Sequence, residues 1–202
     1  MQFTELVQNI EAVKTRNKRR LVALCGSPAS GKSTLAVALE QAIPDSCVVP
    51  MDGFHLDNRI LEQRGLLGRK GSADTFDRSG LLHLVARLST EDEIIFPVFD
   101  RSLDLAIAGA GMVTSKTKTV IIEGNYLLLD RPGWRDLSTF WDFSIYLSVP
   151  ETILRTRLMT RWHDHGISQD SARRKVEGND LPNASFVTNN LLRADIQLEK
   201  LT

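Results

Sequence analysis

The stretch GSPASGKST, residues 26–34, matches the phosphate-binding pattern G-x-x-x-x-G-K-[ST] in full. It follows the apolar run 21–25 and precedes a helical pattern of apolar residues that stops at Pro44. Glycines let backbone N–H groups approach phosphate oxygens, and the N-terminus of the following helix adds the positive end of its dipole. Strand, glycine loop and helix together predict a nucleotide-binding site. The alternative is a glycine-rich turn that binds no ligand.

The residue types of this loop indicate how ATP and Mg²⁺ would be held as cofactors. Lys32 can reach the β- and γ-phosphates and is a candidate catalytic residue. The Ser33 hydroxyl can bind Mg²⁺, which makes Ser33 a candidate metal ligand. The predicted nucleotide contacts are Gly26, Ser27, Ala29, Ser30, Gly31, Lys32, Ser33 and Thr34.

Length and composition describe one ordinary globular domain over residues 1–202. The chain has 25 Lys+Arg, 25 Asp+Glu and 42% hydrophobic residues, so it lacks the basic excess of a nucleic-acid-binding protein. Its longest uncharged runs, 21–31 and 105–115, are too short to cross a membrane, and residues 1–14 do not resemble a signal peptide. We therefore expect a cytoplasmic protein with a small-molecule partner and with neither a nucleic-acid nor a membrane partner. The oligomeric state is open, with a homodimer as one candidate.

Apolar runs alternate with longer mixed segments along the chain, which predicts an α/β fold. With the phosphate loop, this predicts a three-layer P-loop NTPase fold, in which helices flank a mainly parallel five-stranded sheet. The predicted strands are 21–26, 47–52, 93–100, 119–124 and 143–150, with a short final strand in 194–201. The predicted helices are 4–16, 31–43, 57–65, 78–89, 151–163 and 168–177. The basic run 14–20 is expected to be a solvated connector.

Three of the apolar runs end in an acidic residue: Asp52, Asp100 and Glu123. Ligands of open parallel sheets bind at the carboxyl ends of the strands, so these acids are candidate site residues. A carboxylate beside a bound nucleotide can hold Mg²⁺, directly or through water, or accept the proton of an attacking hydroxyl. The alternative is a cap on the next turn, which stays open for Asp100. Glycine directly follows Asp52 and Glu123, which lets a loop pass close to a ligand and favours function there.

Several motifs between residues 20 and 190 resemble those of the pantothenate kinase, uridine kinase and phosphoribulokinase group. They are Met51-Asp52-Gly53-Phe54-His55, Asn58, Arg64-Gly65-Leu66, Arg69-Lys70-Gly71, Thr75-Phe76-Asp77, Pro97-Val98-Phe99-Asp100 and Ile121-Ile122-Glu123-Gly124. Within that group the chain is most similar to kinases described as fructose-transport-system or nucleoside/nucleotide kinase-like. The similarity includes the ending Asn179-Asp180-Leu181-Pro182-Asn183-Ala184.

The resemblance implies phosphoryl transfer from ATP to a hydroxyl of a small molecule. It also implies that Asp52 is the general base beside the acceptor and that Glu123 assists the metal or its waters. Phe99 stands where the group often has Tyr, which removes a hydroxyl that could contact the acceptor. Residues near the acids could hydrogen-bond the acceptor, and the candidates are His55, Arg59, Asp100, Arg101, Asn125 and Tyr126.

The segment of about 151–178, after the last long strand, is predicted to form the lid. Between Arg155 and Lys175 six basic residues accompany two acidic ones, a local excess in a chain of zero net charge. In kinases of this shape such a segment folds over the phosphates, and an arginine delivered by closure can accelerate transfer about 10³- to 10⁵-fold. Arg161 and Arg157 share one helix face and are the candidate catalytic arginines, in that order. The alternative for each is a solvated basic helix.

The sequence therefore predicts an ATP-dependent kinase that transfers the γ-phosphoryl group to a sugar-, nucleoside- or pantothenate-like alcohol. The alternatives are a nucleoside monophosphate kinase, a P-loop nucleotide-binding regulatory switch and a mechanical ATPase subunit. No N-K-x-D guanine-reading motif follows the fourth strand, and no L-S-G-G-Q-type run occurs. These absences weigh against the switch and the mechanical ATPase.

Overall fold

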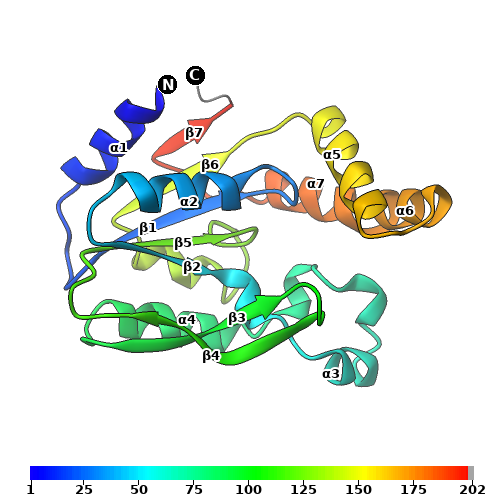
Figure 1. Ribbon diagram of the computed structural model, residues 1–202, viewed down its shortest axis with the longest axis horizontal. Coiled ribbons are helices and arrows are strands. Elements are labelled where there is room, and N and C mark those ends of the chain that lie inside the picture. Colours follow the sequence, from blue (N-terminus) through cyan, green and yellow to red (C-terminus); the bar gives the residue numbers. More distant parts are fainter. Residues whose placement is uncertain (200–202) are drawn as a thin grey trace.

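A five-stranded parallel sheet forms the centre of the protein, whose computed structural model describes residues 1–199 (Figure 1). Across the sheet its strands are β2 (Ser46–Pro50), β5 (Thr119–Gly124), β1 (Arg20–Gly26), β6 (Phe143–Leu147) and β7 (Ile196–Leu198). Every neighbouring pair is parallel. The side chains of β5 are buried throughout and those of β1 nearly so, because the sheet is covered on both faces.

Helices cover the two faces because alternate residues of each strand point to opposite sides. The even-numbered apolar residues of β1 pack with α1 (Phe3–Ala12) and α2 (Lys32–Ala42). Its odd-numbered residues pack on the other face with α4 (Arg78–Leu88). The predicted α/β arrangement of three layers is confirmed (Figure 1). The predicted helix 57–65 is the shorter α3 (Asn58–Gln63).

The prediction that residues 93–100 join the parallel sheet is wrong. β3 (Ile94–Asp100) pairs instead with the antiparallel β4 (Leu105–Val113), and the two form a separate hairpin (Figure 1). The side chains of β3 are mostly only partly buried, and Pro97 has no N–H for a sheet ladder. A two-stranded hairpin tolerates both features, whereas the centre of a parallel sheet does not.

The main sheet keeps five strands because β7 joins it beside β6. β7 lies within the predicted final strand 194–201, of which residues 200 and 201 fall outside the described part of the chain. The predicted number of strands is therefore right, although one member of the sheet is not the expected one.

The first helix and the basic run after it also differ from the prediction. α1 ends at Ala12, four residues early, and Arg19 is fully buried rather than solvated. The Arg19 guanidinium donates to the carbonyl oxygens of Leu88 (3.1 Å), Glu91 (2.5 Å), Thr114 (3.1 Å) and Asp92. It binds the C-terminus of α4 to the residue that follows β4, at a helix end where a cation complements the dipole.

Replacing Arg19 by Met should lower the free energy of unfolding by about 3 kcal/mol, because buried carbonyl groups lose a charged hydrogen-bond donor. Urea denaturation followed by circular dichroism measures the change. Lys14→Met, in the same basic run but exposed, is the matched control and should change the free energy by no more than about 0.5 kcal/mol. A loss below about 1 kcal/mol for Arg19→Met would mean that water replaces the guanidinium at these carbonyls.

Helical segments lie at one end of the sheet, where the sequence predicts a lid over about residues 151–178 (Figure 1). They are α5 (Glu151–Asp164), α6 (Gln169–Lys175), the π-helical turn η5 (Val176–Asp180) and α7 (Leu181–Asn189). Buried residues of α5, η5 and α7 form a small apolar cluster separate from the two that flank the sheet. Within residues 1–199, no helix has the length and apolar character needed to cross a membrane.

Candidate functional site

The phosphate loop lies between β1 and α2, at the carboxyl end of a central strand. Gly31 has a φ of 97° and Ala29 a φ of 61°, so both take the left-handed conformation that turns the chain into the helix. A Cβ at Gly26 would lie 2.7 Å from Ser30 Oγ and 3.2 Å from the Leu147 carbonyl oxygen, so the loop closes only around glycine. In the described chain no side chain caps the N-terminus of α2, which leaves its N–H groups available to an anion.

Arg157 of the lid contacts this loop from outside. Its Nη1 donates to the carbonyl oxygens of Ala29, at 3.2 Å, and Ser30, at 3.0 Å. These contacts commit the guanidinium to the backbone of the loop. They favour a positioning role for Arg157, whereas the sequence grouped Arg157 with Arg161 as a catalytic arginine.

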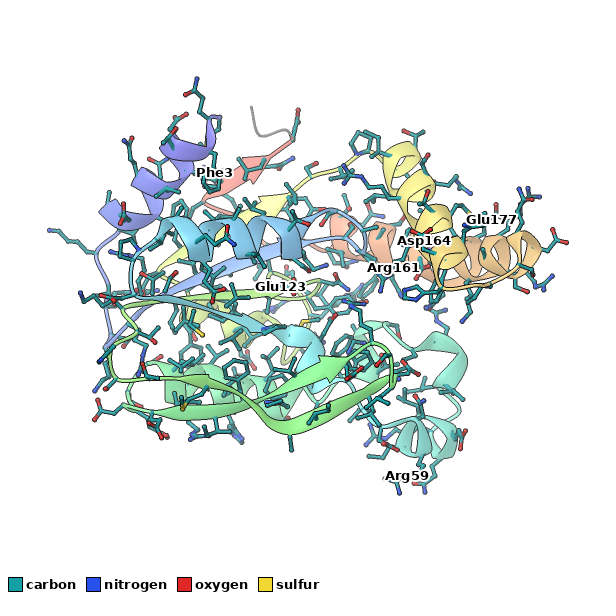
Figure 2. The ribbon with its side chains drawn as sticks, viewed as in Figure 1. Phe3, Arg59, Glu123, Arg161, Asp164 and Glu177 are labelled. Atoms are coloured by element: carbon teal, nitrogen blue, oxygen red, sulfur yellow. The ribbon has the colours of Figure 1, made fainter. Side chains whose placement is uncertain are left out.

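Glu123, at the carboxyl end of β5, lies next to the loop (Figure 2). Ser33 Oγ donates to Glu123 Oε1 over 3.2 Å, so the two predicted metal ligands are in contact. Glu123 is 6% exposed, and its Oε2 has no hydrogen-bond partner among residues 1–199. Burial raises the pKa of Glu123, and the Lys32 ammonium opposes that effect. A buried carboxylate oxygen without a partner, beside a serine hydroxyl, fits a hard cation such as Mg²⁺, which prefers oxygen ligands.

Asp52 lies on the 3-10 turn η1 (Met51–Phe54), immediately after β2. A Cβ at Gly53 would lie 2.0 Å from the Pro97 carbonyl oxygen, so only glycine allows η1 to pack this closely against β3. The close packing brings Asp52 beside the turn that follows β3. There Asp52 Oδ2 accepts a hydrogen bond from Arg101 Nη2 over 2.8 Å. Two predicted site residues from distant parts of the sequence therefore form an ion pair.

His55 lies directly beside Asp52. Its Nδ1 donates to the Asp52 carbonyl oxygen over 2.8 Å, and its ring packs on Phe76 and Phe99 with centroid distances of 4.0 and 4.6 Å. Burial lowers the pKa of His55, so the imidazole is neutral at pH 7. Phe99 therefore supports His55 through packing at a position where a Tyr would add a hydroxyl.

Asp100 caps the hairpin turn between β3 and β4. Its Oδ1 accepts hydrogen bonds from Ser102 N (2.8 Å), Ser102 Oγ (2.6 Å) and Leu103 N (3.0 Å). These hydrogen bonds, led by that of the Ser102 side chain, lower the pKa of Asp100. These contacts support the capping alternative for Asp100 over a contact with the acceptor.

The other predicted acceptor contacts lie in unequal surroundings. Tyr126 is fully buried, and its hydroxyl donates to the Gly71 carbonyl oxygen over 2.7 Å, so it anchors backbone rather than facing an acceptor. Asn125 is 9% exposed, and its Oδ1 has no partner within the described residues. Arg59, on α3, pairs with Asp57 and points away from Glu123 and Arg161 (Figure 2). Asn125 is therefore the candidate that remains among these three.

Arg161 lies on α5 of the lid, where the charges of Asp52 and Arg101 act on it. Burial lowers its pKa, the positive charge of Arg101 lowers it further, and the carboxylates of Asp180 and Asp52 raise it, so these groups are within electrostatic reach. Figure 2 shows Arg161 between the lid and the part of the molecule that carries the hairpin. Arg161 and Arg157 line one hollow of about 370 Å³ on α5. The lid thus places two arginines with different contacts along one helix face.

The motif at 179–184, which the sequence singled out without a role, ties the lid to the acceptor side. Asn179 Nδ2 donates to the Lys70 carbonyl oxygen over 2.9 Å. Asn183, which is buried, donates to Asn179 Oδ1 over 3.3 Å and so orients it. The resemblance includes this motif, but no local pattern in the sequence predicts a hydrogen bond between Asn179 and Lys70, which are 109 positions apart.

Comparison with known proteins places this site among kinases. No family model matches the chain. The chain is 30% identical, over 98% of its length, to a Schizosaccharomyces pombe protein named "Putative uridine kinase", of which it covers 91%. It is 32% identical, over 70% of its length, to the pantothenate kinase of a Nocardioides species, and it spans only 47% of that longer protein. A crystal structure described as a "putative fructose transport system kinase" from Silicibacter sp. TM1040 is 48% identical, with a TM-score of 0.95 over 98% of this chain and 100% of that one.

Proposed function

This chain belongs to the P-loop kinases of the uridine kinase and pantothenate kinase group, and from that premise we propose that it transfers the γ-phosphoryl group of ATP to a hydroxyl. It is a small-molecule kinase. The acceptor would be a sugar-, nucleoside- or pantothenate-like alcohol bound between η1, the hairpin turn and the lid. A cytoplasmic location, where ATP is supplied, fits this reaction.

One observation carries the proposal: three neighbouring strands lead to the three groups that the reaction needs. The three strands are neighbours in the order β2-β5-β1. Asp52 follows β2, Glu123 lies at the carboxyl end of β5, and β1 leads into the phosphate loop. A candidate base, a cation-binding carboxylate and a phosphate cradle thus share one edge of the sheet. Mg²⁺ held by Ser33 and Glu123, directly or through water, would neutralise charge on the phosphate oxygens.

In the proposed reaction, the acceptor oxygen forms a bond to the γ-phosphorus while the bond from that phosphorus to the bridging oxygen of ATP breaks, which releases ADP. Asp52 takes the proton of the acceptor hydroxyl. Lys32 and Arg161 offset the negative charge of the transferring group. Arg157 holds the loop carbonyls so that the loop N–H groups keep their direction.

The alternatives are weaker on chemical grounds. A nucleoside monophosphate kinase transfers the phosphoryl group to a phosphate oxygen. That oxygen is largely deprotonated near neutral pH, so the reaction does not need Asp52 as a base. The regulatory switch and the mechanical ATPase do not agree with the similarity to named kinases along almost the whole chain.

ADP release in the presence of Mg²⁺ and ATP tests the proposal. The protein is incubated with pools of sugars, sugar phosphates, nucleosides, nucleotides and hydroxy acids, and release is compared with the rate without acceptor. We expect one pool to stimulate release and to yield a phosphorylated alcohol in the mass spectrum. The variant Lys32→Ala serves as the control and should show no stimulation. Tight ATP binding without stimulation by any pool would contradict the proposal.

A further inference from the structure

The candidate base Asp52 forms an ion pair with Arg101. Arg101 Nη2 lies 2.8 Å from Asp52 Oδ2, and the Arg101 side chain is 51% exposed. An ion pair this exposed contributes only about 0–1 kcal/mol to stability. A contribution to folding therefore does not account for an arginine placed on the carboxylate that is proposed to take the proton.

The position of Arg101 is built into the fold rather than left to a free loop. Asp100 Oδ1 accepts three hydrogen bonds from residues 102 and 103 and so fixes the turn on one side of Arg101. On the other side, Asp104 is held by Lys70 Nζ, at 2.9 Å, and by Asn58 Nδ2, at 3.1 Å. The hairpin turn therefore presents its arginine toward Asp52 in a defined place.

Arg101 lies within electrostatic reach of a second guanidinium, that of Arg161, as well as in contact with Asp52. The charge of Arg101 lowers the pKa of Arg161 because the two like charges repel each other, whereas the carboxylates of Asp180 and Asp52 raise it. The Lys70 ammonium already contacts Asn58, at 2.7 Å, and Asp104, so these groups of the protein balance its charge. Asp180 and the transferring phosphoryl group can balance Arg161. A second anion is needed to balance Arg101 once Asp52 turns to the acceptor hydroxyl.

We propose that the acceptor carries an anionic group, a carboxylate or a phosphate, besides the hydroxyl that is phosphorylated, and that Arg101 binds this group. The inference rests on the proposed kinase function. A planar guanidinium matches carboxylate and phosphate oxygens with two parallel hydrogen bonds. Since Arg101 contacts the base directly, the anionic group and the reacting hydroxyl are separated by only a few bonds in the acceptor.

This arrangement also makes the base selective. Without an anionic acceptor, Arg101 stays hydrogen-bonded to Oδ2, one of the two carboxylate oxygens of Asp52. When such an acceptor binds, Arg101 transfers its hydrogen bonds to the acceptor anion, and Asp52 is released to take the hydroxyl proton. A neutral alcohol of the same shape has no anionic group to replace Asp52 as the partner of Arg101, so it is a poorer substrate.

Acceptor pairs with and without an anionic group near the hydroxyls test the proposal: glycerate against glycerol, and ribose 5-phosphate against ribose. We expect the anionic member of the preferred pair to have a kcat/KM about 10- to 100-fold higher, as a charged hydrogen bond predicts. Arg101→Gln should bring the ratio close to one, mainly by raising KM for the anionic member. Arg59→Gln, an exposed arginine paired with Asp57 away from the site, is the matched control and should keep the ratio.

Calorimetric titration of the anionic members into protein saturated with ADP and Mg²⁺ separates this inference from the kinase function. Binding that Arg101→Gln weakens about tenfold supports an anion site even if none of the acceptors is phosphorylated, in which case the proposed function alone fails. Phosphorylation of neutral and anionic members at equal kcat/KM overturns the inference and leaves the kinase function standing. Absence of both turnover and anion binding overturns both.

Discussion

Replacing Asp52 by Asn should lower kcat for phosphoryl transfer about 10²- to 10⁴-fold and leave ATP binding nearly unchanged. Asparagine has almost the same shape as aspartate but cannot accept the hydroxyl proton. Asp52 lies on η1, outside the phosphate loop, so the nucleotide contacts stay in place. ADP release with the identified acceptor measures kcat, and calorimetry measures the ATP dissociation constant.

Asp130→Asn is the matched control for this substitution. Asp130 is an exposed acid that pairs with Arg135 in the loop after β5, so its loss should leave kcat unchanged. Retention of nearly the wild-type kcat by Asp52→Asn would reject Asp52 as the base. A fall in melting temperature that exceeds the fall for Asp130→Asn would instead indicate a loss of structure.

Titration with Mg²⁺ distinguishes a base from a metal ligand at the same edge of the sheet. Asp52 contacts Arg101, whereas Glu123 contacts Ser33 and keeps a buried oxygen without a partner in the described chain. We therefore expect Glu123→Gln to raise the Mg²⁺ concentration needed for half-maximal activity. Asp52→Asn should not change that concentration. If it does, Asp52 belongs to the metal site and the base must lie elsewhere.

The phosphate loop and Glu123 could be predicted from the sequence because the information is local. The glycines, Lys32 and Ser33 lie within one short stretch, and a strand and a helix on either side fix their direction. Glu123 ends a continuous apolar run, which a strand covered on both faces must have. In both cases the chemistry follows from a residue's position in its own element.

The acceptor side could not be predicted in the same way because its contacts are long-range. Residues 93–100 have the apolar character of a parallel strand, yet β3 turns back at Asp100 and pairs with β4. In that hairpin Asp100 caps the turn. The same turn places Arg101 in contact with Asp52. A run of single letters does not show that two segments 49 residues apart will meet.

The sequence also did not show which polar side chains are buried in the folded protein. Arg19 belongs to a basic run that looks solvated, but four carbonyl groups of the folded chain surround it. Tyr126 follows Glu123 closely enough to look like an acceptor contact, yet its hydroxyl holds the Gly71 carbonyl oxygen inside the core. Only the packing of distant segments decides whether such polar groups face a ligand or the protein.

Replacing Arg161 by Met should lower kcat about 10³-fold and change ATP binding little, because its charge is used when the phosphoryl group transfers. Arg157→Met should show the opposite pattern. Arg157 donates to the carbonyl oxygens of Ala29 and Ser30, so its loss loosens the loop and weakens ATP binding more than it lowers kcat. Steady-state kinetics with varied ATP, together with ATP calorimetry, separates the two effects.

Arg155→Met provides the control on the same helix, since Arg155 is engaged by Glu151 and Glu177 at the surface. It should leave both kcat and ATP binding near the wild-type values. Equal losses of kcat and ATP binding in the Arg161 and Arg157 variants would mean that the two arginines act together on the loop. The expected split would instead assign transition-state charge to Arg161 and loop geometry to Arg157. It would also show that one helix face carries two arginines because the reaction needs two distinct functions there.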